Sequence, residues 1–90
     1  MNKAELIAAV AEREGLAKTQ AAGTVEAVFE VIQAALKAGD RVQIVGFGIF
    51  EVRERPARRG LNPKTGERID IPASRAPAFK AGKALKELVK

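Results

Sequence analysis

Apolar residues in the amino-terminal part of the chain recur at intervals of three and four, which is the spacing of one face of an α-helix. Asn2 followed by Glu5 resembles a capping box, and Gly15 offers a place for this helix to end. The first apolar set is Leu6, Ile7 and Val10, and the second is Ala21, Val25, Val28, Phe29, Ile32 and Leu36. We therefore predict two amphipathic helices, the longer one ending before Gly39 and Asp40, and we interpret its apolar stripe as core.

The pattern then changes to the alternation of β-strands. Residues 41–45 and 49–55 are rich in β-branched and aromatic side chains, and Gly46 and Gly48 flank Phe47 between them. In the second stretch the apolar set Phe50 and Val52 alternates with the charged set Glu51, Arg53 and Arg55. The pattern predicts two antiparallel strands with one core face and one charged face.

Residues 53–68 cannot fill a core. They hold six cations and two anions, and only Ala57 and Leu61 are apolar apart from two prolines. Asn62, Pro63 and Gly66 are the residue types that a chain reversal favours, and a strand pattern resumes at Ile69 and Ile71. We predict a long two-stranded ribbon that projects beyond the sheet, with its tip near Pro63.

The carboxy-terminal part predicts a short helix. Pro77, Phe79 and Gly82 lead into it, and its apolar side is Leu85, Leu88 and Val89. Lys80, Lys83 and Lys86 repeat at a spacing of three, which places them on one side of the last helical region. We treat residues 1–90 as a single domain made of a helical dimerisation half with the first strand (1–45), a saddle and arm (46–76) and a C-terminal helix (77–90).

Charge is distributed unevenly along the chain. Residues 1–45 hold five cations and six anions, whereas residues 46–90 hold eleven cations and five anions. The basic half predicts a polyanionic partner, most commonly nucleic acid.

Cysteine and histidine are absent, so disulfides, a metal site and an enzymatic role are not expected. The apolar run from Leu6 to Ala11 is too short for a secretion signal or a membrane span, and we expect a cytoplasmic protein.

The order of elements resembles the HU and integration-host-factor family of bacterial histone-like DNA-binding proteins. The resemblance covers the whole chain. Its residues are Gly46 to Arg53, Arg55, Arg58, Asn62, Pro63, Thr65, Gly66, Ile69, Ile71, Pro72, Pro77 to Lys80 and Gly82 to Lys86. Leu61 departs from the family pattern, because members usually carry Arg or Lys there, and Ala81 stands where a proline is frequent.

The resemblance implies an α+β fold: an intertwined dimer with a helical base, a three-stranded antiparallel sheet in each chain and a protruding β-ribbon arm. Each arm would lie along the minor groove, with Pro63 as an intercalating wedge; HU and the integration host factor are standard examples of such minor-groove binding. The expected DNA-binding residues are Lys3, Arg53, Arg55, Arg58, Arg59, Asn62, Pro63, Lys64, Arg68, Lys80, Lys83 and Lys86. The expected dimer core is Phe29, Phe47, Phe50 and Phe79.

Simpler interpretations remain open for several of these residues. The arm arginines could form a solvated strand face, and Pro63 could be a turn residue only. Lys80, Lys83 and Lys86 could be charges that favour solubility, and Lys3 could be an exposed lysine or the ion-pair partner of Glu26. Glutamates 12 and 14, and glutamates 51 and 54, are interpreted as surface charges, so no catalytic residue is assigned.

The sequence therefore favours a homodimer that binds double-stranded DNA largely without sequence specificity, bends and compacts it, and prefers bent, nicked or junction DNA. None of the four phenylalanines lies in the arm, which disfavours base stacking of the kind that single-strand binders use. A sequence-selective bender of the integration-host-factor type and a basic RNA-binding protein are the alternatives. We expect a nucleoid location, no cofactor, no metal, no membrane partner and no small-molecule substrate.

Overall fold

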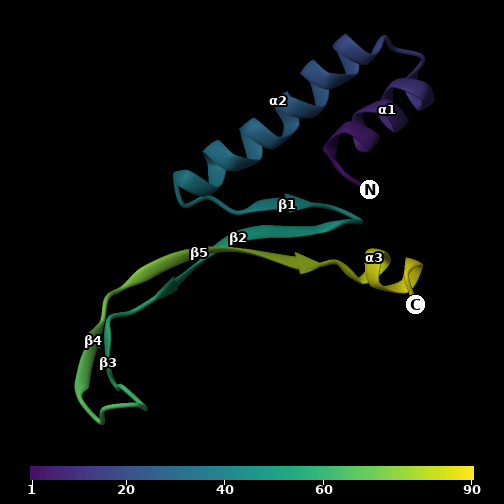
Figure 1. Ribbon diagram of the computed structural model, residues 1–90. Helices are drawn as coiled ribbons and strands as arrows, with labels where there is room; N and C mark the ends of the chain where they lie inside the picture. Colours follow the sequence, from purple (N-terminus) through teal and green to yellow (C-terminus); the bar gives the residue numbers. More distant parts are fainter. The chain divides into compact units, whose positions relative to one another are not determined.

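The computed structural model describes all residues from Met1 to Lys90, and they form two compact units (Figure 1). The first unit is Met1–Ala34 and the second is Ala35–Lys90. Helix α2 (Lys18–Lys37) runs through the boundary, so the division falls inside a predicted helix and not between the segments 1–45 and 46–76. Each unit is described in turn.

The first unit consists of α1 (Lys3–Glu14) and most of α2. Asn2 Oδ1 accepts a hydrogen bond from the Glu5 N–H at 2.8 Å, and Gly15 ends the helix with φ of 65°, so the predicted start and stop signals are confirmed. Three side chains are buried, namely Ala11, Ala21 and Val25. Small buried residues allow close approach of helices, but they bury little apolar surface.

The second unit is built on an antiparallel sheet in the order β1 (Val42–Ile44), β2 (Gly48–Arg55) and β5 (Ser74–Ala81). The strands predicted at 41–45 and 49–55 are confirmed, and the turn between them is closed by a hydrogen bond from the Phe47 N–H to the Ile44 carbonyl. The register places Phe50 opposite Phe79 and Val52 opposite Pro77. Alternation therefore gives the sheet one apolar face.

Gly48 is required by the packing on this apolar face. A Cβ at residue 48 would lie 2.6 Å from the Lys80 carbonyl oxygen and 2.6 Å from Cζ of Phe79. The Phe79 ring occupies the space beside Gly48, and its centroid lies 4.8 Å from that of Phe50 and 5.4 Å from that of Phe47. Three of the four phenylalanines thus form one aromatic cluster.

The arm is the continuation of β2 and β5 beyond the sheet. β1 pairs only with residues 48–50 of β2, so from Glu51 onward the ribbon is two-stranded. It continues as β3 (Arg58–Leu61) paired with β4 (Arg68–Ile71). The register is the same on both sides of the break, with Arg55 opposite Ser74 and Arg58 opposite Ile71. Pro56 and Pro72 lack an N–H, so they interrupt the hydrogen-bonded ladder without shifting its register.

The carboxy-terminal segment differs from the prediction. Pro77, Phe79 and Lys80 lie in strand β5, and helix α3 is confined to Lys83–Leu88, so the segment 77–90 is not a helix throughout. β5 is an edge strand of the sheet, where a proline is tolerated because its missing N–H need not enter the ladder. The three-residue spacing of Lys80, Lys83 and Lys86 therefore does not describe one helix face.

Large apolar side chains stay accessible in the single chain. Phe29 is 39% exposed, Phe47 44% and Phe79 41%, and no large side chain is fully buried. A chain of this length that folds alone buries about 60% of the surface that its unfolded form exposes, which requires larger buried groups than two alanines and a valine. The single chain is therefore short of core.

Candidate nucleic-acid interface

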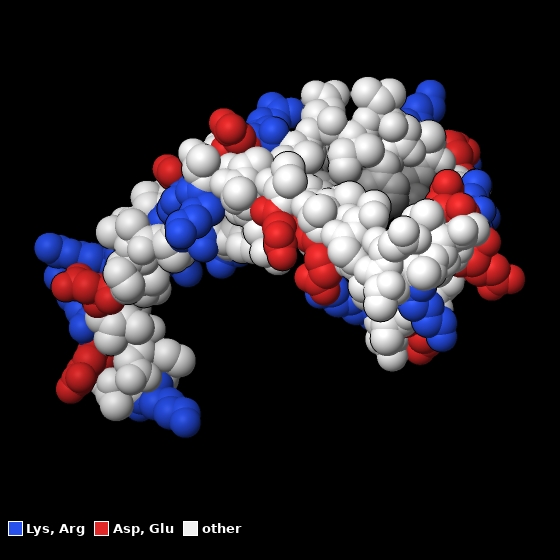
Figure 2. Space-filling view, turned by 90° about the horizontal axis from the view of Figure 1, so that it is seen from above, with Lys and Arg blue, Asp and Glu red and all other residues white.

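The arm carries a concentration of positive charge at its surface. Figure 2 shows Lys and Arg side chains along the ribbon that forms the left part of the view, with fewer acidic groups among them. All six cations of residues 53–68 are exposed. An exposed cationic ribbon without a core of its own is suited to contact a polyanion, since phosphates supply the missing counter-charge.

Two of these cations have acidic neighbours and four do not. Arg53 Nε lies 3.5 Å from Glu51 Oε1, and Arg59 Nε lies 3.9 Å from Asp70 Oδ1. The side chains of Arg59 and Asp70 are 80% and 92% exposed, so water screens their attraction and the pair is weak. The cations with no carboxylate oxygen within 4.0 Å are Arg55, Arg58, Lys64 and Arg68. These four are free to bind an external anion.

Arg53 and Arg55 share one face of the ribbon, as their spacing predicts. The register adds Lys80 to this face, although the sequence had grouped it with the C-terminal helix. Small residues lie beside the arginines on the neighbouring strand: Arg53 is opposite Ala76 and Arg55 is opposite Ser74. We call the set Ile49, Glu51, Arg53, Arg55, Ser74, Ala76, Ala78 and Lys80 the basic sheet face. Its small side chains leave the guanidinium groups the most prominent features there, a detail that becomes visible only once the register is known.

The tip of the arm is a hydrogen-bonded turn. The Asn62 N–H donates to the Glu67 carbonyl at 2.8 Å, and the Gly66 N–H donates to the Asn62 carbonyl at 2.7 Å. Asn62 Oδ1 also accepts from the Lys64 N–H at 2.9 Å, so this side chain has a structural partner. Gly66 has φ of 72°, which confirms the predicted reversal. Pro63 is exposed at the predicted tip.

The three lysines near the carboxy terminus do come together, although by another route than helical spacing. Lys80 at the end of β5 and Lys83 and Lys86 on α3 line one open groove of about 400 Å³, together with Ile49, Ala81, Gly82 and Glu87. A strand and a helix thus supply the same cationic surface. We call Lys80, Lys83 and Lys86 the terminal lysine cluster.

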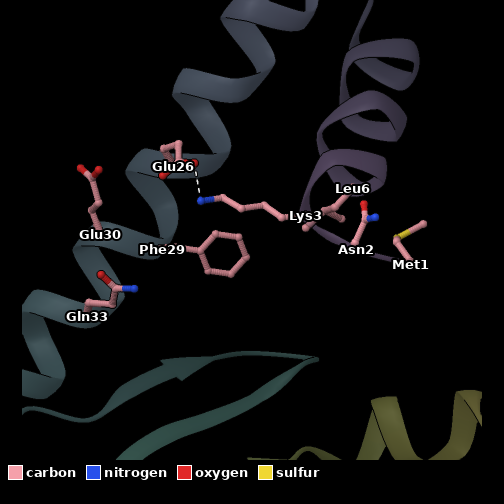
Figure 3. A pocket seen from close by; sticks show the side chains of 8 residues that line it. All are labelled: Met1, Asn2, Lys3, Leu6, Glu26, Phe29, Glu30 and Gln33. Carbon is pink, nitrogen blue, oxygen red and sulfur yellow. Dashed lines mark ion pairs between the residues drawn. The ribbon is translucent and has the colours of Figure 1, made fainter.

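Lys3 lies in the first unit and already has a partner. Its ammonium forms an ion pair with Glu26 Oε1, and the two side chains are 55% and 44% exposed (Figure 3). The pair borders an open cavity of about 610 Å³ that is lined by Met1, Asn2, Lys3, Leu6, Glu26, Phe29, Glu30 and Gln33. The ion-pair alternative for Lys3 is therefore observed, and any phosphate contact must compete with Glu26.

Arg75 is the one cation of the ribbon that the sequence did not assign to DNA. It lies opposite Glu54, on the face that also holds Val52 and Pro77. Its Nη2 is 3.7 Å from the position that a Cβ on Gly39 would occupy, so it reaches toward the turn after α2. Arg75 is therefore turned away from the basic sheet face, and only the strand register separates it from Arg53 and Arg55.

No cluster of three or more His, Cys, Asp or Glu side chains could hold a metal. None of the helices combines the length and the apolar character that crossing a membrane requires.

Comparison with known proteins decides the family. Residues 1–90 match the family described as bacterial DNA-binding protein. DNA-binding protein HU of Geobacillus stearothermophilus is 63% identical over 90 residues, which cover all of both chains. The SPbeta prophage-derived DNA-binding protein HU 2 of Bacillus subtilis is also 63% identical over 90 residues, covering 100% of this chain and 98% of that protein. The chain belongs to the HU family.

Solved structures of HU share its fold. The cocrystal structure of Anabaena HU with DNA is 54% identical, covers 99% of this chain and 97% of its own, and superposes with a TM-score of 0.87. HU from Thermotoga maritima is 39% identical over the full length of both chains, with a TM-score of 0.71. The α+β fold with its arm is therefore the HU fold, and the chain is a bacterial histone-like DNA-binding protein rather than an enzyme.

Proposed function

We propose that this HU-family chain acts as a homodimer that binds double-stranded DNA through the minor groove, largely without sequence specificity, and bends and compacts it. The observation that carries this proposal is the two-stranded arm, whose exposed cations include four without an acidic partner. An arm that cannot pack against its own chain is free to follow a duplex. The cocrystal of Anabaena HU with DNA supports the same partner.

The apolar surface that one chain leaves open supports the proposed homodimer. Phe29, Phe47 and Phe79 keep about two-fifths of their surface exposed, and Phe50 packs in the same cluster as Phe79. Burying a fully exposed large apolar side chain stabilises a protein by about 1.5–3 kcal/mol, and covering the exposed two-fifths of each ring would contribute a corresponding share of that value. A second copy offers a matching set of the same residues, as closed two-fold dimers generally do.

Contacts of the arm are assigned to the minor groove by the chemistry of arginine. Narrow minor grooves concentrate negative potential, and a guanidinium is more weakly hydrated than an ammonium, so it enters such a groove at lower cost. Arg53 and Arg55, on the basic sheet face, would reach into the groove, and Arg58, Arg59, Asn62, Lys64 and Arg68 would contact its walls. The terminal lysine cluster, with Lys3 once it leaves Glu26, would bind flanking phosphates.

Pro63 is proposed as the wedge that enters a base step. It stands exposed at the end of a turn that four hydrogen bonds hold in shape. Partial unstacking of a step costs a few kcal/mol, which the wider contact of a bent duplex can offset. DNA that is already bent, nicked or part of a junction needs less of this deformation, so it should bind more tightly. Such a role belongs to the cytoplasmic nucleoid.

Titration of DNA with the protein at several salt concentrations tests the proposal. A protein that neutralises six to ten phosphates loses about 10³–10⁵ in affinity between about 50 and 200 mM salt. We expect a loss of this order on linear duplexes, similar values for unrelated sequences, and tighter binding to nicked and four-way-junction DNA. A shallow salt dependence, strong preference for one sequence, or preference for structured RNA would contradict the proposal.

A further inference from the structure

Leu61 is an exposed apolar residue in a part of the chain that is otherwise charged. It is the last residue of β3, directly before the tip turn, and it is 65% exposed. The register pairs it with Arg68, and alternation places it on the face that also carries Arg59 and Asp70. A leucine in this position has charged side chains as its neighbours on the strand pair.

The apolar contacts of the arm lie on its other face. A Cβ at Gly60 would lie 3.2 Å from Cδ1 of Ile71 and 3.8 Å from Cγ1 of Ile69, so both isoleucines fold over Gly60. Leu61 points to the opposite side and cannot join them. Packing within the arm therefore does not account for Leu61.

We infer that Leu61 is a second apolar contact with the duplex, adjacent to Pro63, and that the two residues form one composite wedge at the arm tip. Leucine is among the side chains that minor-groove proteins insert between base steps. Arg59 and Arg68 lie beside it and attract the phosphates of the DNA backbone. The sugars and the base steps next to those phosphates offer the apolar surface that Leu61 contacts. This inference rests on the proposed function, because it specifies a contact of the same arm.

The inference predicts how the DNA affinity of this chain depends on salt concentration. An apolar contact releases no counterion, so it adds affinity at every salt concentration without changing the salt dependence. A cation at residue 61 would instead release a counterion, so it would steepen the salt dependence and add affinity mainly at low salt. The chain would thus hold DNA through fewer phosphate contacts and more apolar contact per arm than a relative with Arg or Lys at this position.

The test measures Kd on one linear duplex over a range of salt concentrations, together with the end-to-end distance of the duplex by fluorescence transfer. For Leu61→Ala we expect about tenfold weaker binding at every salt concentration, an unchanged slope of log Kd against log salt, and a less bent duplex. For Leu61→Arg we expect the slope to steepen by about 1.8, which is about 0.9 for each of two arms. Leu61→Met keeps an apolar side chain and should bind like the unmodified protein.

Val89→Ala is the matched control, because Val89 is 78% exposed and lies outside the arm. The inference is overturned if Leu61→Ala binds and bends DNA as Val89→Ala does, or if its loss of affinity is confined to low salt. Either result leaves the proposed function intact, provided the unmodified protein binds with a steep salt dependence. Failure of the unmodified protein to bind duplex DNA would overturn both.

Discussion

Replacing Arg55 by alanine removes one of the four arm cations that have no acidic partner. It lies at the end of β2 on the basic sheet face, opposite the small side chain of Ser74. The structure therefore offers a phosphate or groove contact without competition from a carboxylate. Because the proposed dimer has two arms, each substitution removes two such contacts.

The expected effect follows from these two contacts. An exposed charge-assisted contact contributes about 1 kcal/mol, so the dimer loses about 2 kcal/mol, or about thirtyfold in affinity. Two fewer phosphate contacts also reduce the slope of log Kd against log salt by about 1.8. Since no base is read by sequence in this account, unrelated duplexes should lose affinity to the same extent.

Fluorescence anisotropy on two unrelated duplexes at several salt concentrations measures both quantities. Arg13→Ala on α1 changes the net charge equally and should leave binding nearly unchanged. Arg75→Ala removes a cation from the other face of the same ribbon and should have a smaller effect than Arg55→Ala. Equal losses in all three variants would refute the assignment of binding to the basic sheet face, because net charge alone would then explain the affinity.

Three further substitutions and one control, Gly23→Ala, test other parts of the account. Pro63→Ala should reduce DNA bending, measured by fluorescence transfer between the duplex ends, by more than it reduces affinity; equal bending would remove the wedge role. Gly48→Ala should lower the free energy of unfolding by about 2–3 kcal/mol in thermal or urea denaturation, because its Cβ would collide with a backbone oxygen and the Phe79 ring. Gly23→Ala in α2, where a Cβ meets nothing within 4 Å, is the control and should raise the free energy of unfolding by about 0.5–1 kcal/mol. Equal losses of stability in the two variants would show that packing at Gly48 does not cause the destabilisation. Glu26→Gln should change stability by less than about 1 kcal/mol, since the Lys3 pair is half exposed, and a larger loss would show that the pair holds α1 on α2.

The sequence predicted the elements whose cause is local. The first helix begins at Asn2 and ends at Gly15 because a side-chain cap and a left-handed glycine act within a few residues. The arm was predictable for a different reason: residues 53–68 contain too few apolar side chains to be packed. Its tip followed from the turn preferences of Asn62, Pro63 and Gly66.

Features that depend on pairing between distant strands were not predictable in the same way. Part of β5 was assigned to the C-terminal helix segment 77–90, because the pairing of Phe79 with Phe50 is not visible in local sequence. The same pairing separates Arg75 from Arg53 and Arg55 and brings Lys80 to the lysines of α3. Residue type indicated the partner, and register determined which cations share a surface.

Removal of the arm tests the central claim most directly. Arg55 and Ser74 are register partners, so residues 56–73 can be replaced by a two-residue Asn-Gly turn that keeps β1, β2 and β5. We predict that this variant keeps its helical and strand content and its dimeric mass, and binds duplex DNA more than a hundredfold more weakly than the full chain. Unchanged DNA affinity in a folded, armless dimer would contradict the account.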